Sequence, residues 1–172
     1  LALAGSALAL FVRALDEGQD LHELMETMIA AGVIPGPEDV VDGLLDQWKP
    51  LLKRNLDPME AEVAGHQCLA VVRESGGTGP GLLDQLIVDI EKPGSPAALA
   101  LLRVLATIAG DDQRVAAGQA ADRLAATGVR DQHWVAGLGS PAFTGAFGYR
   151  DELGAQEAIA VTFAYGRHKH AL

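Results

Sequence analysis

The amino-acid sequence predicts a mainly α-helical fold, either a compact helical bundle or a short α-solenoid of about seven helices, followed by a small C-terminal β-hairpin. Three observations lead to this prediction. The 172-residue chain is rich in alanine and leucine, whereas aromatic residues make up only 5% of it. Alanine is the strongest helix former and lets neighbouring helices approach closely. Apolar residues recur at helical spacing between glycine and proline breaks, and the last residues alternate as strands do.

The N-terminal part of the chain is expected to contain three helices. The apolar run 1–12 is too short to span a bilayer and has helical spacing, which favours a buried helix. Asp20 and Glu23 have the spacing of a capping box, so a second helix is expected from there to about Gly32. The third helix is expected to end near Trp48, because a proline follows two residues later.

Four further helices are expected after this point. The fourth begins at Asp57-Pro58, where a capping residue and a first-turn proline stand in their preferred places. The fifth covers 82–90. The sixth follows Ser95-Pro96 and is apolar almost all round, so we expect it in the middle of the packed structure. The seventh ends before Gly128. The glycine-rich run between the fourth and fifth helices is the strongest internal break, and the expected organisation is 1–75 (N-terminal helical subdomain), 76–81 (linker), 82–128 (helical hairpin region) and 129–172 (glycine-rich loop and β-hairpin).

Residues 95–128 contain an apolar helix, a turn at Asp111-Asp112, and Arg114-Val115 at the start of an alanine-rich second helix. This pair resembles a unit of HEAT-like helical repeats. In that family the turn aspartate and the arginine hydrogen-bond along the stack, and the concave surface binds other proteins or nucleic acid. The order Arg-Val departs from the Val-Arg of the family pattern, and no second copy is visible in the chain. A plain helical hairpin is the alternative interpretation.

The composition changes after Gly128. Glycines at 137, 139, 145, 148 and 154 punctuate a segment with interleaved aromatic residues, and this segment is expected to be a loop. Residues 158–165 are β-branched and aromatic in alternation, which predicts a strand. Gly166-Arg167 could serve as a two-residue hairpin turn, and in that register Tyr165 pairs with His168 and Phe163 with His170.

Charge and cysteine content exclude several classes of protein. The net charge of −10 disfavours binding to nucleic acid and to anionic membranes. The single cysteine, Cys68, rules out an intrachain disulfide scaffold and a thiolate zinc cluster. We therefore expect a soluble cytoplasmic protein without membrane association, and the sequence predicts no cofactor.

Two groups of residues are candidates for function. The aromatic residues Trp134, Phe143, Phe147 and Tyr149 could form a binding surface, although Trp134 is better explained as an anchor that holds the glycine-rich segment on the helices. His168 and His170 lie two apart on the expected strand, so both would leave the same face and could share a metal. A third ligand could be His133 or Asp131. The alternative is a polar rim beside Arg167 and Lys169. Asp131 with His133 could also form an oriented general base, but no nucleophile accompanies them.

These observations favour a helical protein-interaction or regulatory module, which would bind a protein partner or another part of a longer chain. The chain starts within an apolar run and stops within a strand-like alternation, which favours a piece of a longer chain. No set of residues converges on a catalytic pattern, so the sequence favours a protein that is not an enzyme. The alternative is a small-molecule-binding or enzymatic domain that uses the segment 137–154 and the nearby histidines.

Overall fold

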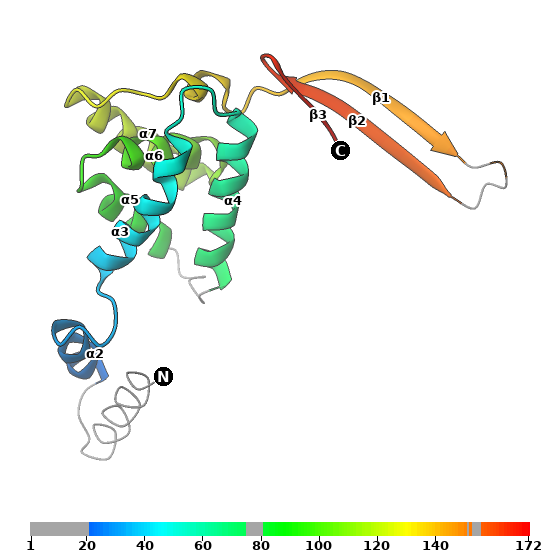
Figure 1. Cartoon of the computed structure of the whole chain (residues 1–172). Coiled ribbons are helices and arrows are strands. Elements are labelled where there is room, and N and C mark those ends of the chain that lie inside the picture. The colour runs from blue at the N-terminus through cyan, green and yellow to red at the C-terminus, as the bar shows by residue number, and fades with distance from the viewer. Residues whose placement is uncertain (1–20, 75–80, 151, 153–155) are drawn as a thin grey trace. The chain divides into compact units, whose positions relative to one another are not determined.

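The computed structural model describes residues 21–74, 81–150, 152 and 156–172, and the side chains from residue 26 onward. The described residues form six α-helices and a three-stranded sheet (Figure 1). This confirms the predicted mainly helical fold with a β-hairpin at the C-terminal end. The helix expected in the run 1–12 and the cap expected at Asp20 lie outside the described residues. No described helix is long and apolar enough to cross a membrane.

The chain divides into two compact units, Leu1–Leu44 and Leu45–Leu172. The sequence instead places its main break at 76–81. The two helices on either side of that glycine-rich run, α4 (Pro58–Glu74) and α5 (Leu82–Glu91), both pack against α6 (Pro96–Ile108). Because α4 and α5 both pack against α6, the two sides of this run belong to one unit.

The first unit contains α2 (Leu21–Ala30) and the start of α3 (Pro37–Trp48). Met28 is buried, and Val33 and Ile34 pack against it. The Asp39 carboxylate accepts a hydrogen bond from the Gly36 N–H at 2.9 Å, which satisfies a free donor at the start of α3. α3 ends at Trp48, as the proline at 50 predicts, and a 3₁₀ turn, η1 (Lys49–Leu51), follows it.

The second unit has α6 at its centre. α6 packs against α4, α5 and α7 (Asp111–Ala126), and we call α4–α7 the helical body. Ser95 caps α6 by accepting a hydrogen bond from the Ala98 N–H at 3.1 Å. The largest fully buried side chains lie on α6, apart from one on α5: Ile90, Leu99, Leu101, Leu102, Val104 and Leu105. The apolar helix predicted to lie in the middle of the structure does so.

Small residues set the spacing between these helices. Gly65 on α4 is buried against α6, and a Cβ atom at this position would lie 2.4 Å from Val104 Cγ1 and 2.7 Å from Ile108 Cδ1. No side chain larger than hydrogen fits there unless the side chains of Val104 and Ile108 move. The alanine-rich composition has the same consequence for α7, where the buried face includes Ala117, Ala120 and Ala121.

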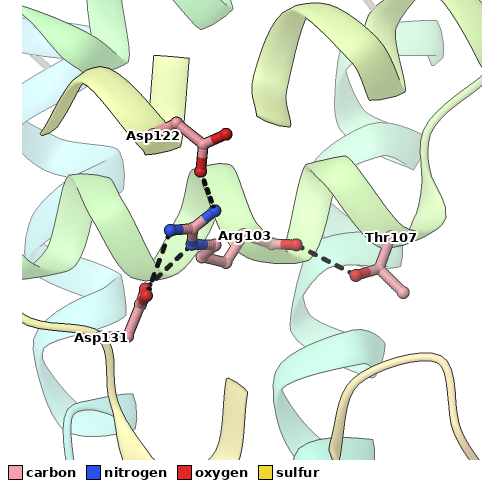
Figure 2. A network of polar contacts seen from close by, with 4 residues as sticks. All are labelled: Arg103, Thr107, Asp122 and Asp131. Atoms are coloured by element: carbon pink, nitrogen blue, oxygen red, sulfur yellow. Dashed lines mark hydrogen bonds and ion pairs between the residues drawn. The ribbon is translucent and has the colours of Figure 1, made fainter. Parts of the chain in front are cut away.

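The helical body also carries an ion network, drawn in Figure 2. The Arg103 guanidinium on α6 donates to both carboxylate oxygens of Asp131, at 2.9 and 3.1 Å, and to Asp122 on α7 at 2.7 Å. These hydrogen bonds, with Asp131 first, raise the pKa of Arg103. Asp131 is thereby held to the helices and does not pair with His133.

The C-terminal strands form an antiparallel sheet in the order β1-β2-β3, which we call the β ribbon. Its strands are β1 (Ala142–Arg150), β2 (Glu157–Tyr165) and β3 (His168–Ala171). The predicted pairs Tyr165 with His168 and Phe163 with His170 are confirmed, and Gly166 in the turn has a φ of 57°. Figure 1 shows β1 and β2 as one long paired ladder with β3 beside β2.

Strand β1 corrects the expectation that the whole glycine-rich segment is a loop. Residues 142–150 pair with β2 along their length, with a bulge between Phe143 and Gly145. Glycine weakens a strand but does not prevent one where a neighbour supplies side chains to cover it. Here the Phe147 ring covers Gly145, because a Cβ atom at that glycine would be 3.5 Å from two ring carbons.

Candidate functional site

The ladder register divides the aromatic residues of the β ribbon between its two faces. Residues paired across an antiparallel ladder share a face. Phe147 and Tyr149 pair with Ala160 and Ala158, so they share one face with small residues. Phe143 pairs with Phe163 and therefore lies on the opposite face, together with Val161 and Ile159. The expected binding surface is thus split in two.

The aromatic side chains of β1 are exposed on both faces. The exposed fractions are 70% for Phe143, 64% for Phe147 and 62% for Tyr149. On β2, Ile159 is 75% exposed, and Leu172 beyond β3 is 76% exposed. Leu172 and Val161 exchange backbone hydrogen bonds of 2.8 and 2.9 Å, so Leu172 belongs to the same ladder. Large apolar side chains gathered on one element are typical of a surface that another molecule covers.

Trp134 does not belong to this surface. It lies in a 3₁₀ turn, η2 (His133–Gly137), is only 3% exposed, and donates its indole N–H to the Leu51 carbonyl at 3.0 Å. At the end of this turn the chain runs directly over the start of α4, because a Cβ at Gly137 would lie 2.7 Å from Pro58 Cγ. Trp134 therefore acts as the anchor that the sequence favoured.

The base of the β ribbon is joined to α4 by a polar cluster that we call the junction: Asp57, Glu62, Tyr165, His168 and His170. The Tyr165 hydroxyl donates to Glu62 Oε2 at 2.7 Å, and the Gly139 N–H donates to Glu62 Oε1 at 2.7 Å. Glu62 thus holds both the ribbon and the segment that leads into it. Burial, followed by the hydrogen bond to Glu62 and the charges of Glu62 and Asp57, raises the pKa of Tyr165 to about 12.

Asp57 has two roles in the junction. Its Oδ1 accepts a hydrogen bond from the Met59 N–H at 3.1 Å, which caps α4. Its Oδ2 lies 2.9 Å from His170 Nε2 and 3.5 Å from His168 Nδ1. Asp57 is the one charged residue among the buried side chains that the structure describes. Buried carboxylates need partners, and the two imidazoles are the groups that stand beside this one.

The two histidines leave the same face of β3, as their spacing predicts, but aromatic residues surround His170. Its ring stacks on Phe163 with centroids 5.2 Å apart and meets the Tyr165 ring edge-on at 6.0 Å. Over the described part of the chain, no three histidine, cysteine or acidic residues are grouped so that they could hold a metal ion. Asp131, one suggested third ligand, is held by Arg103. Metal binding by His168 and His170 stays a prediction without further support.

A pocket of about 400 Å³ opens beside the junction. Three segments far apart in the sequence line it: the approach to α4, the turn η2 and the turn between β2 and β3. The polar or charged lining residues are Arg54, Asn55, His133, Tyr165, Arg167 and His168, and the apolar ones include Leu56, Pro58 and Trp134. His133 and His168 thus line the same pocket, whereas Asp131 does not line it.

In the helical pair α6–α7, the HEAT-like resemblance concerns the contacts of the turn aspartate and of Arg114. Arg114 donates to the Ala109 carbonyl at 3.2 Å and stands 3.9 Å from Asp111, so its contacts stay within its own hairpin. The half-buried Cys68 has its pKa raised by burial, which lowers the reactivity of its thiol.

The chain matches no protein-family model, no curated protein and no solved structure with which it was compared. The geometry of the ribbon and the junction is therefore the basis of the functional argument.

Proposed function

We propose that this chain is a protein-interaction module whose β ribbon binds an extended segment of a partner protein, or of another part of a longer chain, along strand β1. The observation that carries the proposal is the combination of a strand edge that no described strand covers with exposed aromatic side chains on both faces of the same strand. The helical body supplies the fixed platform, and the junction sets where the ribbon leaves it.

The edge of β1 is open to a further strand. Within the described residues, β1 pairs with β2 on one side only, because the strand order is β1-β2-β3. Natural sheets protect exposed edges with charges, prolines or very short strands. β1 has nine residues, contains no proline, and carries a single charge, on its last residue Arg150. An edge of this kind is suited to pairing with another strand through backbone hydrogen bonds.

The placement of the aromatic residues favours an extended occupant over a flat one. A single flat surface could cover Phe147 and Tyr149 or the opposite face with Phe143, but not both. A strand added beside β1 sends alternate side chains to both faces. Its residues would then contact Phe147 and Tyr149 on one face and Phe143 on the other, which covers all three exposed rings.

The proposal is tested with the full chain as bait in lysate of its source organism, with mass spectrometry as the readout. Three baits are compared: the unchanged chain, a double variant Phe147→Ser/Tyr149→Ser, and a control, Val115→Ser. Val115 is 59% exposed on α7, so the control removes an exposed apolar side chain away from the ribbon. We expect a stoichiometric partner that the double variant loses and the control keeps.

Pairing along β1 is then checked on the purified complex by amide hydrogen exchange. The amides of residues 142–150 should become protected when the partner binds, because an added strand supplies acceptors to them. Absence of a stoichiometric partner, retention of the partner by the double variant, or protection confined to the helical body would each refute the proposal.

A further inference from the structure

The pocket beside the junction is cationic, although the chain as a whole is acidic. Its cationic side chains are Arg54 and Arg167, together with the imidazoles of His133 and His168, and none of its lining residues is an Asp or a Glu. The whole chain, by contrast, has a net charge of −10. A concave site of one sign within a chain of the other sign concentrates ions of opposite charge to itself. Here those ions are anions.

The arginines of the pocket have no acidic partner in the described part of the chain, unlike Arg103 and Arg123 of the same unit. Arg103 donates to two carboxylates, and Arg123 donates to both oxygens of Glu91 at 2.7 Å. The ion pairs of the described residues include neither Arg54 nor Arg167. Each guanidinium therefore keeps donors in the fork geometry that matches a carboxylate or a phosphate.

His168 adds an imidazole ring to the lining. Its Nδ1 lies 3.5 Å from the buried carboxylate of Asp57, which leaves Nε2 as the nitrogen for a ligand. In the protonated imidazole both nitrogens donate, so Nδ1 can face the carboxylate while Nε2 donates to an anion. Asp57 does not line the pocket itself, so the carboxylate positions the ring from outside the space that an anion would occupy.

The remaining lining residues favour a ligand with an apolar part. Leu56, Pro58 and Trp134 are buried side chains whose outer atoms line the pocket, and Tyr165 lines it with them. A volume of about 400 Å³ falls in the range of small-molecule sites. The lining thus offers cationic donors together with an apolar surface.

We propose that this pocket binds a small organic anion, in which a phosphate or carboxylate group contacts Arg54 and Arg167 and an aromatic or other flat apolar group lies against Pro58 and Trp134. The site is separate from the edge of β1 and does not depend on the proposed interaction function. It develops the small-molecule alternative, with the basic residues around the junction in place of the glycine-rich segment.

The test is a titration of the full chain with phenyl phosphate, benzoate, inorganic phosphate and the neutral probe benzyl alcohol, followed by two-dimensional amide NMR. We expect one of the two organic anions to shift the amides of Gly166, Arg167 and His168. The tighter of the two identifies the head group. Benzyl alcohol should bind far more weakly than either, because it lacks the charge, and inorganic phosphate should bind more weakly than phenyl phosphate, because it lacks the ring.

Variants locate the binding. Arg54→Gln and Arg167→Gln should each weaken the affinity for the organic anion by about tenfold, the loss expected for one charged hydrogen-bonding pair. Arg73→Gln is the matched control, since Arg73 is exposed on α4 and does not line the pocket. The proposal is overturned if neither organic anion binds, if benzyl alcohol binds as tightly as they do, or if Arg73→Gln loses as much affinity as the pocket variants.

Discussion

The helical body and the β ribbon belong to the same compact unit, but the central helix of the body and the long strands of the ribbon differ in how far their apolar side chains are exposed. On α6, eight of the side chains from Ala97 to Leu105 are buried, and the four helices of the body share that one core. On β1 and β2, Phe143, Phe147, Tyr149 and Ile159 are all more than 60% exposed. The apolar residues of α6 are mostly buried, whereas most of the large apolar residues of β1 and β2 are exposed.

This contrast indicates where the stability of the fold resides and where we propose that binding occurs. A core that is closed on all sides carries most of the free energy of folding. A two- or three-stranded ribbon without a covering layer is marginal in water and depends on its attachment. Here the attachment is the junction, in which Asp57 and Glu62 at the start of α4 hold Tyr165, His168 and His170. We therefore expect that side chains of the ribbon can be altered without unfolding of the helical body, as the proposed contact surface requires.

The largest expected effect comes from removing the same kind of side chain from the two regions. Leu101→Ala, at a fully buried position of α6, should lower the free energy of unfolding by about 2–5 kcal/mol. Ile159→Ala, at a position 75% exposed on β2, should change it by no more than about 0.5 kcal/mol. Denaturant unfolding of both variants measures the difference. A comparable loss of free energy of unfolding in both variants would mean that the ribbon face is covered in solution. The proposed difference between a buried body and an exposed ribbon would then be wrong.

A pair of glycines gives a smaller effect with opposite signs in the two regions. Gly65→Ala gains helix propensity but forces a methyl group against Val104 and Ile108, so we expect a net loss of about 1–2 kcal/mol. Gly148→Ala on β1 meets no atom within 4 Å and should gain roughly 0.5 kcal/mol, because alanine restricts the unfolded chain.

Thermal and denaturant unfolding measure the change in the free energy of unfolding for both glycine variants. The double variant Gly65→Ala/Val104→Ala serves as the internal check, since removal of the opposing methyl groups should reduce the cost of the Gly65 substitution. Stabilisation by Gly65→Ala alone would show that α4 and α6 do not approach as closely as described.

The helical body is the part of the fold that sequence patterns predict best. Helix starts and ends depend on neighbouring residues, so Ser95 and Pro96 could be placed at the start of α6 and the proline at 50 after the end of α3. The β2–β3 pairing is also local, because a two-residue turn fixes its register. Strand β1 escapes prediction because its glycines at 145 and 148 interrupt the alternation, and its pairing with β2 depends on residues further along the chain.

The candidate sites show the limit of such patterns more clearly. The spacing of His168 and His170 places both rings on one face, but nothing near them in the sequence points to Asp57, which reaches them from the cap of α4. The same holds for the cationic pocket, where Arg54, His133 and Arg167 come from three separate segments. Only the tertiary fold brings these residues together, and a pattern within one segment carries no signal of it.

A smaller loss of stability than those of Leu101→Ala and Gly65→Ala is expected at the junction, where the two regions meet. Tyr165→Phe removes the hydrogen bond to Glu62 and should lower the free energy of unfolding by about 0.5–1.5 kcal/mol near pH 8. The pKa of Tyr165 is raised to about 12 in the folded protein, above the value of about 10 for an unfolded tyrosine. The contribution of the hydroxyl is therefore fully present below about pH 10 and is lost as the pH rises through about 12.

The unchanged chain should consequently lose stability between about pH 10 and 12 more steeply than Tyr165→Phe, so that the two curves of stability against pH converge. Tyr149→Phe is the matched control, because that ring is 62% exposed on the ribbon and lies outside the junction. Absorbance of the tyrosinate ion gives an independent readout, since the titration near pH 12 should persist in Tyr149→Phe and disappear in Tyr165→Phe. If Tyr165→Phe loses stability over this range as steeply as Tyr149→Phe does, the hydroxyl of Tyr165 does not hold the ribbon to α4.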